Sequence, residues 1–526
     1  MKRHNQFLIL LFLITCLIFT GCVPIGSGLV SYDRMEYSRP NMEQFASVLE
    51  ESCSTALSTE NMRLLEDAIW AVYDEYDAFY TNLSLAFIAH SRDLTDIYWA
   101  GEYAYCASYS ATADAALDRL YRTLAQSPLR EELEGEDYFG ADYFDSFDGE
   151  SIYDAHLIEL FSKEAELCTQ YQEVYAASGD VEYYSDVYFE TYGDQMAQIY
   201  VELIALRQEI AAYTGYSSYP EFAYDFYYVR DYTPQQATAY LADIRAELSP
   251  LYRQLMQKEG INLQSAGETE TFSYVRSMAK NMGGIFWNAF HDMEQAGVYD
   301  ISYGEHKYST SFEIYLSYYG IPYIFLSPTG TEYDKLAFAH EFGHFCSDYV
   351  TLGGSVHGVD AAEVISQGME YLSLVYAEDG ASMVSLKMAD CLRTYVEQAA
   401  YASFEQQVYG LTGEDLTAEN VQALYEQVCT GFGLDVAGWD ARDYVCIAHF
   451  YETPFYIISY VLSNDAALQL YEMERSQQGN GVACFEGALR STSPYFLAFL
   501  EEVGLESPFA AHRLSTVRQL LENLIT

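Results

Sequence analysis

The sequence predicts a mainly helical fold with a small β-sheet. From about residue 46 onward, apolar residues recur at steps of three and four, as they do along residues 64–72. Only two short segments, near 310–316 and 321–326, have the composition of strands instead. Half of the 526 residues are hydrophobic, which is enough to fill a large core.

The predicted helices follow in chain order from this periodicity. One begins after the polar stretch 59–62, and the others cover about 92–125, 157–177, 185–213 and 234–258. Thr233 is predicted to cap the last of these helices, with Pro234 at its first position, where a missing N–H has no cost. The acidic and aromatic stretch 131–150 is predicted to be a solvated connection.

The two predicted strands lie directly before another predicted helix. The second strand, 321–326, is bounded by Gly320 and Ser327, and the helix is expected to start with Thr331 as its N-cap. Because the edge of a strand can hydrogen-bond an extended peptide, this adjacency indicates a peptide ligand.

This helix carries the pentapeptide HEFGH at positions 340–344. His340 and His344 are four residues apart and lie on one helix face, where both imidazoles can bind one metal ion. Glu341 stands beside them in the position of a general base. The pattern is typical of the zinc-binding helix of a metallopeptidase, and it predicts a site for one Zn²⁺ ion.

A third protein ligand is expected, because a catalytic zinc ion usually has three protein ligands and one open position. The metzincin continuation of the motif fails, since Ser347 stands where glycine is needed and Val350 where histidine is needed. The remaining candidates are the downstream acids Asp348, Asp360, Glu363, Glu370 and Glu378.

Two of these acids, Glu363 and Glu370, are seven residues apart in a helical run over 361–377 and share one face. One of them can bind the metal while the other orients a ligand histidine. The preceding glycine-rich stretch 353–358 gives the chain freedom to bring this helix back over the first. It contains His357, a secondary candidate for supporting the site or binding substrate.

A later segment supplies hydrogen-bond donors, namely His449, Tyr451, Tyr456 and Tyr460. Peptide hydrolysis places negative charge on the former carbonyl oxygen, and donors aimed there stabilise that charge. His449 and Tyr456 are the leading candidates for this role, and Tyr451 and Tyr460 are secondary ones. With 51 tyrosines in the chain, a purely structural role in the core is the competing interpretation.

Three segments together resemble the thimet oligopeptidase and oligoendopeptidase F family of zinc peptidases: Phe338–His344, Ala362–Glu370 and His449–Tyr460. The second is similar to the family's Glu-x-x-Ser-x-x-x-Glu segment, whose first glutamate binds zinc, and this implies Glu363 as the third ligand. The third is similar to an HFYxxPFYxxxY segment of the oligoendopeptidase F relatives. The resemblance implies two helical lobes around a deep substrate channel that admits short, unfolded peptides.

The chain departs from the family pattern at three places. The spacer between His344 and Glu363 has 18 residues, several fewer than in the relatives. Ser347 replaces a histidine often found three residues after the motif, and Ala448 replaces a proline before the late histidine. None of these changes removes a group that the chemistry requires, so they indicate a divergent member.

The first residues resemble a bacterial lipoprotein signal. A basic start and an apolar run over 7–19 lead to a small-residue cleavage site that ends at Cys22. We expect removal of residues 1–21, lipidation of Cys22 and a flexible tether over 22–45, followed by a helical lobe (46–230) and a catalytic lobe (231–526). The protein is thus predicted to be exported and held by lipid on the extracytoplasmic side of the membrane.

Charge and cysteine content exclude other classes. The formal net charge is −52, from 78 acidic residues against 26 lysines and arginines, and this argues against nucleic acid as a partner. The cysteines are scattered without a CxxC pair, so a cysteine-based metal site has no support.

The leading hypothesis is a zinc metallopeptidase that acts on short peptides. Zinc would be held by His340, His344 and Glu363, with Glu341 as general base. His449 and Tyr456 would stabilise the oxyanion. Two alternatives remain: a catalytically silent peptide-binding lipoprotein on the same fold, and a related gluzincin carboxypeptidase.

Overall fold

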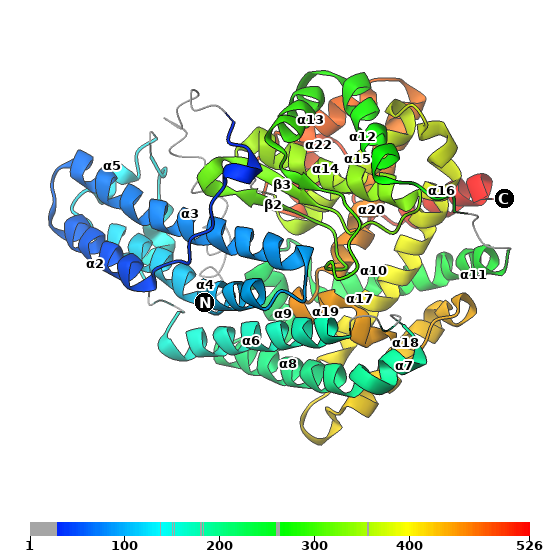
Figure 1. Cartoon of the computed structure of the whole chain (residues 1–526), viewed down its shortest axis with the longest axis horizontal. Helices are drawn as coiled ribbons and strands as arrows, with labels where there is room; N and C mark the ends of the chain where they lie inside the picture. The colour runs from blue at the N-terminus through cyan, green and yellow to red at the C-terminus, as the bar shows by residue number, and fades with distance from the viewer. Residues whose placement is uncertain are drawn as a thin grey trace.

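The computed structural model describes residues 29–525 except 137, 150, 152, 179–180, 182–183, 259–262 and 355–356. The fold is mainly helical with one three-stranded sheet, which confirms the predicted fold class (Figure 1). The predicted signal segment 1–21 and Cys22 lie outside the described residues. Within the described part of the chain, no helix is long and apolar enough to cross a membrane.

Three long helices form the N-terminal part of the molecule: α2 (Met42–Ser58), α3 (Met62–Arg92) and α4 (Ile97–Leu124). They pack side by side at one end of the molecule, drawn in blue in Figure 1. Their apolar faces form a small hydrophobic cluster that spans residues 45–147. The predicted helix over 92–125 starts only at residue 97, because the preceding helix continues to Arg92.

The stretch 131–150 was predicted to be solvated, and this is wrong. It contains the short helices α5 (Arg130–Leu133) and η2 (Tyr143–Phe147). Tyr143 and Phe147 are buried against Tyr121, with ring centroids 6.0 and 5.3 Å from it. The burial of its aromatic rings therefore outweighs the acidity of this stretch.

The central helices largely match their predicted ranges, and their bounds are α6 (Ala155–Ala177), α7 (Asp186–Tyr188), η3 (Phe189–Gly193), α8 (Asp194–Tyr213), α9 (Tyr219–Phe222), η4 (Ala223–Tyr227), α10 (Pro234–Glu247) and α11 (Ser249–Gln257). The predicted cap at Thr233 is confirmed: its hydroxyl accepts from Gln236 N at 3.2 Å, and the Gln236 side chain accepts from Thr233 N at 2.9 Å.

The remaining elements are α12 (Glu268–Met282), α13 (Gly284–Ala296), β1 (Tyr299–Asp300), β2 (Phe312–Leu316), β3 (Ile321–Phe325), α14 (Tyr333–Thr351), α15 (Val359–Tyr376), α16 (Gly380–Arg393), η6 (Thr394–Gln398), α17 (Ala399–Val408), α18 (Ala418–Phe432), α19 (Ala448–Glu452), α20 (Ile457–Ser476), α21 (Asn480–Ala488), α22 (Phe496–Val503) and α23 (Arg513–Ile525). Five further helical turns of three or four residues each are η1 (Tyr32–Arg34), η5 (Ser317–Tyr319), η7 (Gly413–Asp415), η8 (Leu434–Ala437) and η9 (Asp443–Cys446).

The sheet has the strand order β1-β3-β2, so β2 is an edge strand. β1 pairs with β3 in parallel, and β2 pairs with β3 antiparallel, with Glu313 opposite Ile324. β2 and β3 were predicted. β1 was not, because two residues are too few to produce a strand pattern in the sequence.

The helix α14 begins later than predicted, at Tyr333 with Glu332 as its N-cap, so the prediction of Thr331 as the cap is wrong. Thr331 instead forms an isolated bridge with Ser265. The first turn is held by Asp334, whose carboxylate accepts hydrogen bonds from two backbone N–H groups of the preceding loop.

Helix α15 packs between α14 and α20 in the C-terminal half of the chain. Gly343, within the HEFGH motif, makes the close approach possible: a Cβ there would lie 2.7 Å from Ser366 Cα and 2.9 Å from the Ile365 carbonyl oxygen. Any side chain at this position would push the two helices apart.

Hydrophobic packing crosses the predicted lobe boundary near residue 230. One large cluster includes residues from Leu85 to Leu521, and only the smaller N-terminal cluster lies apart from it. The described part of the predicted flexible tether, residues 29–45, also packs on the body. The Tyr32 and Tyr323 rings lie 4.6 Å apart and are tilted by 41°, and Tyr37 donates a hydrogen bond to Glu102 at 2.6 Å.

Candidate active site

The structure brings the two motif histidines together with one of the predicted acids. Glu363 of α15 places Oε2 3.3 Å from His340 Nε2 and Oε1 3.7 Å from His344 Nε2. The three ligand atoms that these residues offer all lie within 4.8 Å of one another. Two imidazole nitrogens and one carboxylate oxygen are a donor set that suits zinc with an open fourth position, so the residues fit the predicted metal.

Glu370, seven residues after Glu363 on the same face of α15, supports His340. Its Oε1 lies 2.8 Å from His340 Nδ1, and its Oε2 accepts from Lys387 Nζ at 2.6 Å. Burial opposes the charge of Glu370, but the Lys387 ammonium and His340 keep its pKa below the usual range. A carboxylate here accepts a hydrogen bond from the Nδ1–H group of His340. The proton is thereby kept on Nδ1, and the lone pair of Nε2 is directed at the metal position.

The pKa values of the two glutamates beside the metal position, Glu363 and Glu341, are shifted in opposite directions. Burial alone would raise the pKa of Glu363, but His340 and His344 hold it well below its usual range, so Glu363 is a carboxylate. Burial raises the pKa of Glu341 even though the same histidines act against this shift. A raised carboxyl pKa suits a group that must both accept and release a proton near neutral pH.

The late segment brings its donors to the same place. Tyr456, at the start of α20, donates to Glu363 Oε1 at 2.5 Å. His449 Nε2 lies 3.1 Å from the Tyr460 hydroxyl, and the Tyr460 ring is 6.5 Å from the ring of His340. Burial lowers the pKa of His449 to about 4, so this imidazole is neutral at pH 7.

Of two further secondary candidates, Tyr451 lies outside the site cavity and His357 lies in its wall. The prediction of Tyr451 as a substrate-binding residue is wrong, because its ring is fully buried and stacked 3.8 Å from Tyr171, and its hydroxyl bonds to the Met196 carbonyl. His357 lines the cavity, but its ring packs against Phe499 at 5.3 Å, and burial lowers its pKa to about 4. His357 is therefore placed as part of the cavity wall.

A buried network that sequence reasoning missed fixes the start of α15. The Asp360 carboxylate accepts hydrogen bonds from Arg230, from Tyr232 at 2.8 Å and from Ser459 of α20 at 2.5 Å. Asp360 was considered only as a metal ligand. No local signal reveals its partner, because 130 residues separate Arg230 from Asp360.

Two cavities meet beside these residues. The site cavity has about 450 Å³ and is lined by the candidate metal ligands His340, His344 and Glu363, by Glu341 and by residues of the edge strand β2. The second chamber has about 640 Å³ and lies between α4, α6 and the η4 segment. Both are lined by Thr453 and Tyr456, so they adjoin across this boundary.

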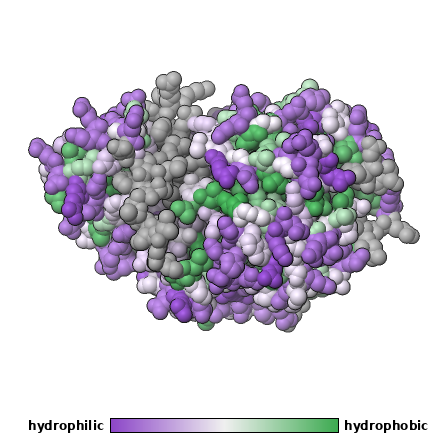
Figure 2. All heavy atoms as spheres, turned by 90° about the horizontal axis from the view of Figure 1, so that it is seen from above, coloured by the Kyte–Doolittle hydropathy of each residue, from purple (hydrophilic) through white to green (hydrophobic). Residues whose placement is uncertain are grey.

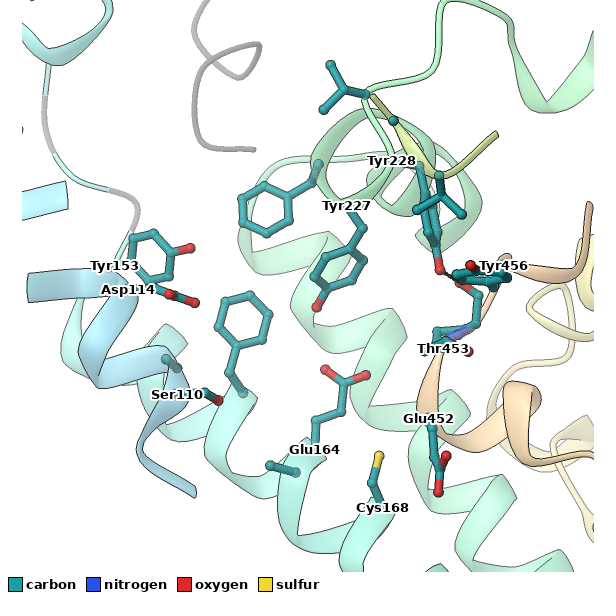
Figure 3. A pocket seen from close by; sticks show the side chains of 18 of the residues that line it. Ser110, Asp114, Tyr153, Glu164, Cys168, Tyr227, Tyr228, Glu452, Thr453 and Tyr456 are labelled. Atoms are coloured by element: carbon teal, nitrogen blue, oxygen red, sulfur yellow. Dashed lines mark hydrogen bonds between the residues drawn. The ribbon is translucent and has the colours of Figure 1, made fainter. Parts of the chain in front are cut away.

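Aromatic rings and carboxylates line the second chamber, as Figure 3 shows. The carboxylate of Glu164 points towards Tyr227, and Asp114 and Tyr153 form the opposite side. On the outer surface seen from above, hydrophilic residues dominate and apolar ones gather near the middle (Figure 2).

Fold and site together define a helical protein with a candidate HExxH-type metal centre in an internal cavity. Residues 32–149 match the family model of the peptidase M3 N-terminal domain, over nearly the same range as the smaller hydrophobic cluster. No curated protein matches the chain.

Solved structures match the fold over 94% of this chain and 98% of theirs. They include a putative oligoendopeptidase F (TM-score 0.82, 20% identity), PZ peptidase A with an inhibitor (0.81, 19%) and a putative oligoendopeptidase F from Bacillus anthracis str. Ames (0.78, 19%). The chain thus matches the M3 N-terminal domain over residues 32–149 and has the fold of these oligoendopeptidase F structures, which confirms the predicted resemblance to that family.

Proposed function

We propose that the protein hydrolyses peptide bonds in short peptides with one zinc ion held by His340, His344 and Glu363. The observation that carries this proposal is the convergence of three ligand atoms within 4.8 Å, beside Glu341 and in a cavity. The M3 family match and the oligoendopeptidase neighbours support a peptidase in general.

The chain's own residues divide the work. A bound zinc ion would supply Lewis acidity, which polarises the scissile carbonyl and makes water a better nucleophile. Glu341 accepts the proton of the attacking water and passes it to the leaving amine. His449, Tyr456 and Tyr460 border the same cavity and provide hydrogen-bond donors for the oxyanion.

The free edge of β2 provides a docking strand for the peptide backbone. The N–H of Ile324 donates to Val298 on the β1 side at 3.1 Å, so the backbone groups of Ile324 face away from β2. Glu313 lies opposite Ile324, and in an antiparallel ladder its own N–H and C=O then point to the free edge. Residues 310–313 line the site cavity, so an extended peptide can pair there.

The size of the cavities supports short peptides as the substrates. Cavities of about 450 and 640 Å³ are in the range of small-ligand sites and hold a few residues of extended chain. A folded domain is too large for them. We also propose export and lipid attachment at Cys22, which rest on the sequence of residues 1–22.

The test uses protein produced from residue 23 onward, a panel of internally quenched peptides and measured zinc content. We expect one zinc per chain and hydrolysis that a chelator abolishes and added zinc restores. Glu341→Gln should retain zinc but lower kcat by about 10²–10⁴-fold, because general-base catalysis contributes that much. Glu419→Gln, an exposed residue of α18, is the matched control and should leave kcat unchanged.

Hydrolysis that survives both the chelator and Glu341→Gln would refute the zinc mechanism. Stoichiometric zinc with peptide binding but no hydrolysis would favour the catalytically silent alternative. Mass spectrometry of the products separates internal cleavage from removal of a single C-terminal residue.

A further inference from the structure

Three polar residues on one wall of the site cavity have no role in the proposed chemistry. Glu313 comes from β2, and Ser347 and Asp348 come from α14, and all three line the cavity. We call this group the acidic wall. Ser347 and Asp348 follow His344 by three and four residues, so they continue the same helix face beyond the metal-binding residues.

Two residues of the acidic wall carry buried polar atoms that have no hydrogen-bond partner among the described residues. Ser347 is only 4% exposed, yet its hydroxyl has no hydrogen-bond partner among the described residues, and neither does the buried Glu313 Oε1. Buried polar groups are nearly always hydrogen-bonded, so unpaired groups that line a cavity point to a ligand that completes them.

Charge identifies that ligand. No lysine or arginine is found among the described residues that line the site cavity. The nearby Lys387 is bonded to Glu370. Burial raises the pKa of Glu313, with Asp348 and Glu341 adding to the shift, and burial raises the pKa of Asp348 to about 6 although His344 acts against it. Glu313 and Asp348 are thus two acids whose charge no lysine or arginine of the described cavity lining offsets, in surroundings where a charge that enters is weakly screened.

In the second chamber, by contrast, a carboxylate is paired with a cation of the protein. There Glu164 is paired with the buried Arg207 at 2.6 Å. The site cavity has no counterpart of Arg207 within the described part of the chain. A positive charge is therefore expected from outside the protein.

The strand register places a substrate side chain at the acidic wall. A peptide paired with the free edge of β2 sets one of its residues beside Glu313, whose backbone groups face that edge. Neighbouring residues of paired strands have their side chains on one face with Cβ atoms about 4.5–5.5 Å apart, where opposite charges attract.

We infer that the acidic wall is a specificity site for a lysine or arginine side chain of the substrate, at the position that pairs with Glu313. This inference rests on the proposed peptidase function and deepens it. The acidic wall would select among substrates and would take no part in the bond-breaking step.

The test measures kcat/KM for quenched peptides that differ at one position, which carries lysine, arginine, methionine or glutamate in turn. Each position on both sides of the cleaved bond is scanned. We expect one position at which lysine and arginine exceed methionine by about tenfold or more, as for a hydrogen bond to a charged group. Peptides with free and acetylated N-termini separate a side-chain cation from an α-amino group.

Glu313→Gln and Asp348→Asn should each lower the ratio of kcat/KM for the lysine peptide to kcat/KM for the methionine peptide at that position. Glu313→Lys should reverse the preference towards glutamate. Glu419→Gln is again the control. Zinc content and melting temperature are measured for every variant, so that damage to the metal site or the fold is recognised.

The outcomes separate this inference from the proposed function. If the wild-type protein cleaves no peptide, the proposed function fails. If it cleaves peptides but is indifferent to charge at every position, or if Glu313→Gln slows lysine and methionine peptides equally, the inference alone is refuted. A dependence on the α-amino group alone would likewise overturn the assignment to a side chain.

Discussion

Carboxylates line both the site cavity and the second chamber, but they are engaged in different ways. In the chamber, Asp114 accepts from the hydroxyls of Tyr76 and Tyr80 at 3.0 and 2.6 Å, and Glu164 is paired with Arg207. In the site cavity, Glu363 faces two histidines and Glu313 Oε1 has no hydrogen-bond partner among the described residues, while Glu452, at the border with the chamber, accepts from Tyr308 and Gln172.

This difference shows how one composition serves two purposes. Protein donors that satisfy a carboxylate fix its geometry and reduce its demand for a ligand. Carboxylates that face histidines or the open cavity, and not other protein donors, keep the capacity to bind a metal ion or a cationic side chain. The chamber is therefore expected to contribute shape and apolar contact, and the site cavity to contribute charge.

The largest effect is expected on zinc affinity, when one glutamate of the site cavity and one of the second chamber are each replaced by glutamine. Glu363→Gln removes the anionic oxygen ligand, and we expect zinc affinity to fall by more than about a hundredfold, since even supporting residues cost 10–100-fold. Glu164→Gln removes the same charge in the chamber and should leave zinc affinity unchanged. Competition with a chromophoric chelator measures both values.

The assignment of the third ligand depends on the same measurement. Glu370→Gln should weaken zinc binding by about 10–100-fold, less than Glu363→Gln does, because Glu370 acts through His340. If zinc binding survives Glu363→Gln and is lost in Glu370→Gln, the roles of the two glutamates have been exchanged.

A smaller effect is expected from two tyrosines that the sequence places five residues apart. Tyr456→Phe removes a donor that lies against Glu363, and kcat should fall by about 10–10²-fold at an unchanged zinc content. Tyr451→Phe keeps the stacked ring but removes the hydroxyl that donates to the Met196 carbonyl in the core, and it should lower stability while kcat is retained. Equal losses of kcat in both variants would contradict a role for Tyr456 at the oxyanion.

The sequence predicted the fold class and the metal-binding cluster because both depend on local spacing. Helical periodicity fixed most helices, and the i, i+4 spacing of His340 and His344 fixed their common face. The pair of Glu363 and Glu370 was predicted from seven-residue spacing, with one expected at the metal and one behind a histidine, as the geometry has them.

What the sequence missed depends on contacts between distant segments. The Arg230–Asp360 pair and the unpartnered Glu313 have no local signature, since only the packing of α14, α15 and β2 brings their surroundings together. Tyr451 was misjudged for the same reason: its spacing from His449 and Tyr456 resembles a functional run, and burial against Tyr171 decides otherwise.

The smallest expected effect concerns stability and tests whether the chamber acids are really satisfied. Burial raises the pKa of Asp114 from 3.8 to about 6 even though two tyrosine hydroxyls act against the shift. The folded state then binds the proton more tightly than the unfolded state. This contribution to stability is fully present below pH 3.8 and is lost as the pH rises through about 6.

Asp114→Asn keeps the acceptor for Tyr76 and Tyr80 but removes the titration. At pH 8 the variant should therefore be more stable than the wild-type protein by about 1–3 kcal/mol, since one pKa unit corresponds to about 1.4 kcal/mol. At pH 4 the difference should nearly vanish. Thermal unfolding at the two pH values measures it. A variant that is less stable at pH 8 would mean that the ionised carboxylate gains more from its tyrosines than it loses by burial, and it would contradict the raised pKa of Asp114.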